Sequence, residues 1–149
     1  MTGEQYAISD GGHMLARLSN EMVGIMKEYY GRGPVQAKSY MLDDFLLVVM
    51  RGGLLKAEET MLGFGHSDLV RQFRQTFQNA MGDKLVDIVE GIAGRKVVTY
   101  QSQVMFDPTV IVELFFFDRP AAEHAVHDTA VGQVTDESVG EVRTDAAAS

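Results

Sequence analysis

The segment Phe45-Leu46-Leu47-Val48-Val49-Met50, followed by Arg51 and Gly52-Gly53, places six consecutive apolar residues between an acidic turn and a pair of glycines. Such a run is typical of a strand that is covered on both faces, because successive side chains point to opposite sides. Residues 35–42 mix polar and apolar side chains, and Asp43-Asp44 between the two runs is typical of a turn. We therefore predict a β-hairpin whose second strand lies at the centre of a sheet.

An amphipathic helix is expected before this hairpin, over residues 13–30. Its apolar residues recur at spacings of three and four and are Met14, Leu15, Leu18, Met22, Ile25, Met26 and Tyr29. Gly31-Arg32-Gly33-Pro34 then supplies a glycine suited to a helix end and a proline that cannot continue the helix. The helix is expected to stop at Gly31.

Two further helices and a second hairpin are expected after Gly53. Residues 54–62 fit a short helix, and Ser67 is the predicted N-cap of a long helix that reaches Gly94, with Gly82 as the position for a kink or break. Residues 96–106 and 110–117 predict the second hairpin. The economical packing is an α+β two-layer sandwich, a four-stranded antiparallel sheet of two hairpins with the long helix and one or two further helices on one face.

The chain has 149 residues, which favours one domain with one sizeable core. We divide it into a flexible lead-in over residues 1–12, a single α+β domain over residues 13–117 and an acidic, mostly disordered tail over residues 118–149. The tail carries two basic and seven acidic residues and no aromatic residue, Leu, Ile or Met. It cannot bury enough apolar surface to offset the entropy lost on ordering.

Composition excludes several classes of function. The net charge of −8 and the pI of 4.9 disfavour a broad attraction to nucleic acid or to an anionic membrane surface. The longest apolar runs are far shorter than the ~20 residues of a membrane-spanning helix and no secretory signal is visible, so we expect a cytoplasmic protein without direct membrane insertion. The absence of cysteine excludes disulfides, thiolate metal sites and a cysteine nucleophile.

Two glycine junctions are the first candidates for a binding site. Gly31-Arg32-Gly33 has the composition of a phosphate loop, but phosphate loops follow a strand and open a helix, whereas this segment closes one. Gly52-Gly53 does follow a strand and precede a helix, yet it lacks the third glycine and the lysine of the known fingerprints. An anion site and a plain turn therefore stay as alternatives at both junctions.

Three arginines supply the charge for a small cationic spot on this acidic protein, Arg51 at the end of the central strand and Arg71 and Arg74 on the long helix. The alternative is that they form surface ion pairs with Asp68, Glu58 or Glu59. The full set of candidate contacts for an anion or a partner is Gly31, Arg32, Gly33, Arg51, Gly52, Gly53, Arg71 and Arg74.

No pattern typical of an enzyme emerges. The sequence has no Ser/His/Asp order and no G-x-S-x-G elbow, and its paired carboxylates fit a turn and the first turn of a helix. His124 and His127 have a spacing used by metal ligands, but solvated histidines in an acidic segment are the simpler interpretation. We expect no catalytic residue, no metal and no cofactor.

Three motifs follow one another around the hairpins and the long helix, and they are Gly31-Arg32-Gly33-Pro34, Leu54-Leu55-Lys56-Ala57-Glu58 and Gly91-Ile92-Ala93-Gly94-Arg95-Lys96-Val97. Their order over residues 14–117 resembles the MpsC-like family, a bacterial domain of unknown function described in connection with a Na+-translocating, membrane-potential-generating system. Leu55 stands where a threonine is usual, so the threonine cap of the short helix is lost, and Ala93 replaces a small hydroxyl residue. Because these motifs are turns and caps, the resemblance implies a fold more than a mechanism.

The resemblance and the missing catalytic pattern imply a non-enzymatic accessory or regulatory module that acts by protein association, with a membrane protein of an ion-transport system as a partner. A sensor domain that binds a small anion or metabolite at the glycine junctions is the alternative, and nucleic acid is not an expected partner. The two apolar strands leave one set of side chains without a cover. We therefore expect a homo-oligomer, most simply a dimer, that forms through this sheet face or through the long helix.

Overall fold

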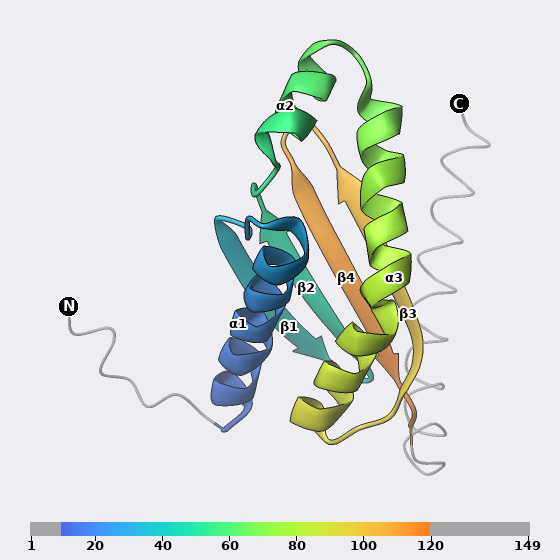
Figure 1. Ribbon diagram of the computed structural model, residues 1–149. Helices are drawn as coiled ribbons and strands as arrows, with labels where there is room; N and C mark the ends of the chain where they lie inside the picture. Colours follow the sequence, from blue (N-terminus) through green and yellow to red (C-terminus); the bar gives the residue numbers. More distant parts are fainter. Residues whose placement is uncertain (1–9, 120–149) are drawn as a thin grey trace, which may run out of the picture. The chain divides into compact units, whose positions relative to one another are not determined.

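The computed structural model describes residues 10–119 (Figure 1). In chain order the elements are α1 (Asp10–Tyr30), β1 (Gln36–Leu42), β2 (Phe45–Arg51), α2 (Lys56–Gly63), α3 (Ser67–Ala93), β3 (Val97–Met105) and β4 (Val110–Phe117). These elements belong to one compact unit, which ends at Asp118. The strands form a four-stranded antiparallel sheet in the order β1-β2-β4-β3, which confirms the α+β fold and the central place of β2.

The helices α1 and α3 lie on the same face of this sheet, α1 near β1 and β2 and α3 near β3 and β4 (Figure 1). The inward side chains of the two central strands pair across the sheet, as in Leu46 opposite Phe115 and Met50 opposite Ile111. Together with the buried stripes of α1 and α3 they form the core. The two hairpins thus form the sheet on which the helices pack, and burial of these apolar side chains is the main contribution to the stability of the fold.

The predicted end of the first helix is confirmed. Gly31 adopts a φ of 83° and its N–H donates to the carbonyl of Lys27 at 2.9 Å, so the glycine closes α1 in a left-handed conformation. The start was placed too late, since α1 already begins at Asp10 and includes three residues of the predicted lead-in. Residues 1–9 and 120–149 lie outside the described residues, and with them both histidines and all but the first two residues of the acidic tail predicted over residues 118–149.

Two predictions about α3 were wrong. Ser67 is the first residue of the helix and not its N-cap, a position that His66 occupies without a side-chain capping bond. Gly82 does not break the helix, which is continuous from Ser67 to Ala93. A Cβ at Gly82 would lie 3.3 Å from the ring of Tyr100 on β3, so this glycine allows the tyrosine ring to approach the helix closely.

Candidate functional site

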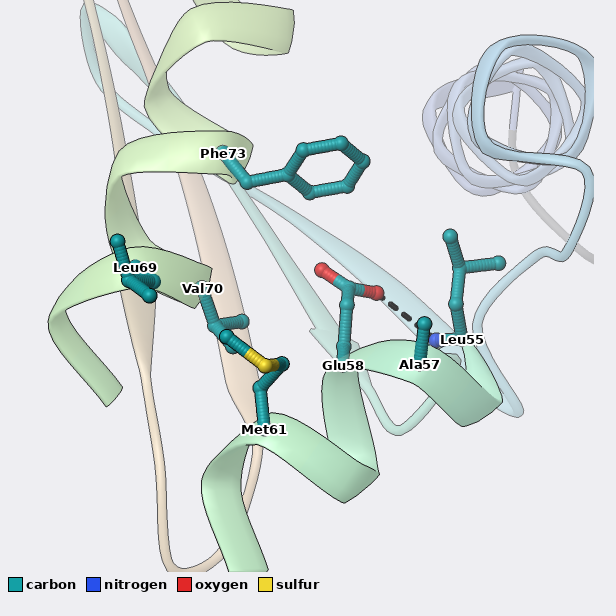
Figure 2. A pocket seen from close by; sticks show the side chains of 7 residues that line it. All are labelled: Leu55, Ala57, Glu58, Met61, Leu69, Val70 and Phe73. Atoms are coloured by element: carbon teal, nitrogen blue, oxygen red, sulfur yellow. Dashed lines mark hydrogen bonds between the residues drawn. The ribbon is translucent and has the colours of Figure 1, made fainter. Parts of the chain in front are cut away.

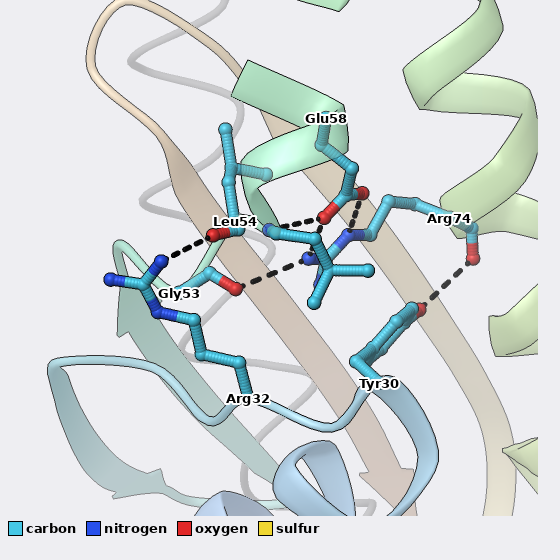
Figure 3. A network of polar contacts seen from close by, with 7 residues as sticks. Tyr30, Arg32, Gly53, Leu54, Glu58 and Arg74 are labelled. Atoms are coloured by element: carbon cyan, nitrogen blue, oxygen red, sulfur yellow. Dashed lines mark hydrogen bonds and ion pairs between the residues drawn. The ribbon is translucent and has the colours of Figure 1, made fainter. Parts of the chain in front are cut away.

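A buried ion pair joins α2 to α3 (Figure 3). Arg74 Nε donates to Glu58 Oε2 at 2.6 Å and Arg74 Nη2 to Glu58 Oε1 at 2.5 Å, a bidentate arrangement. The two residues are only 3% and 4% exposed. Loss of either member of such a buried pair strongly lowers the stability of the fold, because the remaining charge is then buried without compensation.

The same ion pair also contacts three further residues, Leu55, Gly53 and Tyr30. Glu58 Oε1 accepts the N–H of Leu55 at 2.8 Å, which is one half of a capping box, while the leucine side chain supplies no oxygen for the other half. Arg74 Nη2 donates to the carbonyl of Gly53 at 3.3 Å, and its guanidinium lies 3.9 Å from the ring centroid of Tyr30 at the end of α1. Burial raises the pKa of Tyr30 to about 12, so its hydroxyl stays protonated and donates to the carbonyl of Arg74 at 3.4 Å.

The glycine junctions are shaped by close passage of the chain. Gly53 has a φ of 84°, and a Cβ there would lie 2.8 Å from Pro34 Cα. At Gly52, with a φ of 70°, a Cβ would lie 2.9 Å from Val35 Cγ2. Arg32 is exposed at the same place and donates from Nη1 to the carbonyl of Leu54 at 3.0 Å (Figure 3). The backbone conformation and the close chain passage therefore explain why glycine occupies both positions, without any ligand.

The structure brings the two predicted glycine junctions together, since Val35 N–H donates to the carbonyl of Arg51 at 2.8 Å and a Cβ at Gly53 would lie 2.9 Å from the carbonyl oxygen of Gly33. Arg32 and Arg74 both donate to carbonyls of this junction. Of the three acidic residues offered as ion-pair partners of the arginines, Glu58 binds Arg74, but the pair is buried and does not lie on the surface. An anion at this junction would have to compete with the carboxylate that already holds the Arg74 guanidinium.

Arg71 lies away from this junction, and the other candidates have structural roles in the two segments that meet there. Arg71 donates from Nη1 to the carbonyl of Val104 at 2.7 Å and lies over the ring of Phe106 at 5.0 Å, so it holds α3 to β3. Arg51 ends β2 in the register row of Gln36 and Val110. Gly31 is the helix stop, and at Gly33 a Cβ would lie 3.3 Å from the carbonyl oxygen of Val23, while Gly52 turns the chain after β2.

A pocket of about 260 Å³ lies beside the ion pair, between α2 and α3 (Figure 2). It is lined by Leu55, Ala57, Glu58, Met61, Leu69, Val70 and Phe73. The Glu58 oxygens are occupied by Arg74 and by the N–H of Leu55, so the pocket is apolar in character. Leu69 and Phe73 on its rim remain 49% and 40% exposed.

Sequence reasoning missed Glu113, a carboxylate of β4 that is completely buried at 0% exposure. Tyr100 donates its hydroxyl to Glu113 Oε1 at 2.5 Å, and Ser102 Oγ donates to Oε2 at 2.6 Å. Burial raises the pKa of Glu113 to about 7, although the bonds from the two hydroxyls oppose this shift. The signal was present, because Glu113 is the single charged residue in the otherwise apolar run 110–117.

The outer face of the sheet, opposite the helices, is apolar along both central strands. Its central residues are Phe45, Leu47 and Val49 of β2 and Val110, Val112, Leu114 and Phe116 of β4, all of them partly buried. Phe45 and Phe116 stack across the strands with their ring centroids 5.3 Å apart. Within residues 10–119 the helices lie against the opposite face, so this outer face has no helical cover.

Residues 10–119 lack two kinds of feature. These residues contain no group of three or more His, Asp or Glu side chains placed to hold a metal ion. They also contain no helix that is both long enough and apolar enough to cross a membrane.

This geometry defines a small α+β domain with a one-sided helical layer and an open apolar sheet face. Residues 11–119 match the family described as the Na+-translocating membrane potential-generating system (MpsC), and the chain belongs to that family. It is similar to the uncharacterized protein YbcI of Bacillus subtilis (strain 168), with 29% identity over 94 residues that cover 62% of this chain and 76% of YbcI. No solved structure matches the chain.

Proposed function

We propose that the chain is a non-enzymatic accessory module that acts by protein association, and that its outer sheet face binds a second copy of the chain. The observation that carries this proposal is the row of seven apolar residues on the central strands, which in residues 10–119 no helix covers. A contiguous apolar patch of this kind is typical of an interface.

The pattern across the outer face favours a copy of the chain as the occupant. One edge carries Lys38 and the opposite edge Gln103, and both lie in the register row of Val49 and Val112. Two copies can stack these faces about a two-fold axis that lies between the two sheets, runs parallel to the strands and passes midway between β2 and β4. Such an axis would put Lys38 over Gln103 of the partner subunit and would bring the apolar residues of the two central strand pairs together. The four strands place no carboxylate on this face, so the lysine would meet a neutral acceptor, the amide of this glutamine.

The family description supports the second part of the proposal, which is a link to a membrane ion-transport system. In this proposal the dimer is an accessory or regulatory component on the cytoplasmic side, and a membrane protein of that system is its further partner. The sensor alternative has weaker support, because Arg32 and Arg74, two of the three arginines at the glycine junctions, already bind a carbonyl or a carboxylate of the chain itself.

The experiment is a sedimentation comparison of two charge substitutions. Val112→Lys places a cation at the centre of the outer face and is expected to give monomers at concentrations where the unmodified chain is dimeric, since a buried unpaired charge is costly. Leu69→Lys makes the same kind of change on α3 and is expected to leave the dimer intact. Dissociation by Leu69→Lys, with no effect of Val112→Lys, would place the interface on the helix and refute the use of the sheet face.

A further inference from the structure

Glu113 sits at the centre of a small polar cluster that the proposed association does not use. Ser102 faces it across the sheet on β3, and the Tyr100 hydroxyl that binds it also lies 3.0 Å from Gln78 Oε1 on α3. The Tyr100 ring stacks on Phe115 with centroids 4.8 Å apart. The carboxyl group thus joins the sheet to α3 through a single tyrosine.

Within residues 10–119 no cation compensates a charge on this carboxyl group. Its neighbour on β2 is the apolar Val48, β3 contributes the two hydroxyls, and α3 contributes the neutral amide. From α1 the ionisable side chain is Tyr30, whose own pKa is raised by burial and further by Glu113. Among the described residues Arg74 is the one buried cation, and it is paired with Glu58.

Solvent can reach this cluster from one side. A polar pocket of about 330 Å³ lies between α3 and β3, and its walls include Gln78, Gly82, Tyr100 and Ser102. The two hydroxyls that bind the carboxyl group therefore border an opening. Asp83 of α3, an exposed carboxylate, also lines this pocket and adds no positive charge near Glu113.

We propose that Glu113, held by Tyr100 and Ser102, is a proton-binding site whose ionisation weakens the packing of β3 against α3. An uncompensated charge in this position is penalised by loss of hydration, and water drawn to it from the pocket must enter between the Tyr100 ring and the helix. The neutral carboxyl group fits the structure as it stands, because it can donate one hydrogen bond and accept another.

The direction of the pH effect follows from the two states of the chain. The carboxyl pKa is 4.5 in a free chain and about 7 in the fold, so the folded form holds the proton over a range in which the unfolded form has lost it. Stability from this group is complete below pH 4.5 and is lost as the pH rises through 7. Between pH 5 and pH 8 the linkage relation gives an increase of about 70-fold in the unfolding equilibrium constant.

The test compares urea unfolding of the unmodified chain, Glu113→Gln and Glu59→Gln at pH 5 and pH 8, at one chain concentration. Glu113→Gln keeps the shape and the hydrogen-bonding capacity of the side chain but cannot ionise. In this variant the change of about 70-fold in the unfolding equilibrium constant between pH 5 and pH 8 is expected to be absent. Glu59→Gln removes an exposed carboxylate next to the ion-paired glutamate of α2 and is expected to follow the unmodified chain.

A second measurement does not depend on how the variant folds. The carbon chemical shift of the Glu113 carboxyl group, followed by NMR in the unmodified chain, is expected to titrate near pH 7 together with the ring signals of Tyr100. A midpoint below pH 5, or an unchanged pH dependence in Glu113→Gln, would overturn the proposal. The NMR midpoint reports on Glu113 whether or not the outer face forms a dimer, and the urea comparison uses one chain concentration so that association contributes alike to the three proteins.

Discussion

Replacement of Arg74 by methionine is the substitution for which the structure gives the sharpest expectation. The guanidinium makes two bonds to Glu58 and one to the carbonyl of Gly53, and it covers the ring of Tyr30, all at 3% exposure. Removal of one member of such a buried pair costs about 3–5 kcal/mol, because the carboxylate is left buried and uncompensated. In a domain of just over 100 residues this corresponds to a fall in Tm of roughly 12–20 °C.

Urea unfolding and calorimetry measure this loss directly. The matched control is Arg71→Met, three residues earlier on α3, where the side chain is exposed and binds a carbonyl, so a loss of about 1 kcal/mol is expected. The double variant Glu58→Leu with Arg74→Met should be more stable than Arg74→Met alone, because it leaves no buried charge. A loss below about 1 kcal/mol for Arg74→Met would show that the pair behaves as a surface ion pair, and the reasoning would fail.

Two further substitutions test the glycine junctions. Gly53→Ala is expected to destabilise the chain by at least about 2 kcal/mol, because the residue has a positive φ and its Cβ would collide with Pro34. Gly63→Ala changes a helical position where the added Cβ would have nothing within 4 Å, so it should be neutral or stabilising by up to about 1 kcal/mol. Equal losses of stability for the two variants in thermal melts would contradict this reasoning. Arg32→Ala should cost about 1 kcal/mol in urea unfolding, since it removes the bond to the Leu54 carbonyl, and an unchanged stability would show that this exposed bond contributes nothing.

The strand pattern could be predicted from the sequence because it depends on short-range alternation. The run 110–117 gave the bounds of β4, and the six apolar residues after Asp44 placed β2 at the centre of the sheet. The glycine stop at residue 31 is equally local, since one residue with a positive φ ends the helix. Expectations failed where a distant segment decides the outcome, as at Gly82, whose role depends on the ring of Tyr100 from β3.

The candidate site shows the same limit. Arg74 and Glu58 were named as partners from their charges, but their burial depends on how α2 folds back on α3, which no local pattern reveals. Glu113 was passed over because a lone carboxylate carries no motif. Its inward position follows from the alternation of β4, and a charged residue at an inward position of a central strand is by itself a reason to look for partners.

The claim that the outer sheet face binds a second copy of the chain can be checked from the mass of the unmodified chain in solution. One chain has a mass of 16.4 kDa. Light scattering behind size exclusion, over a series of micromolar concentrations, is expected to give twice this mass at the upper end and a decline toward the mass of one chain on dilution. A mass of 16.4 kDa at every concentration would contradict the claim.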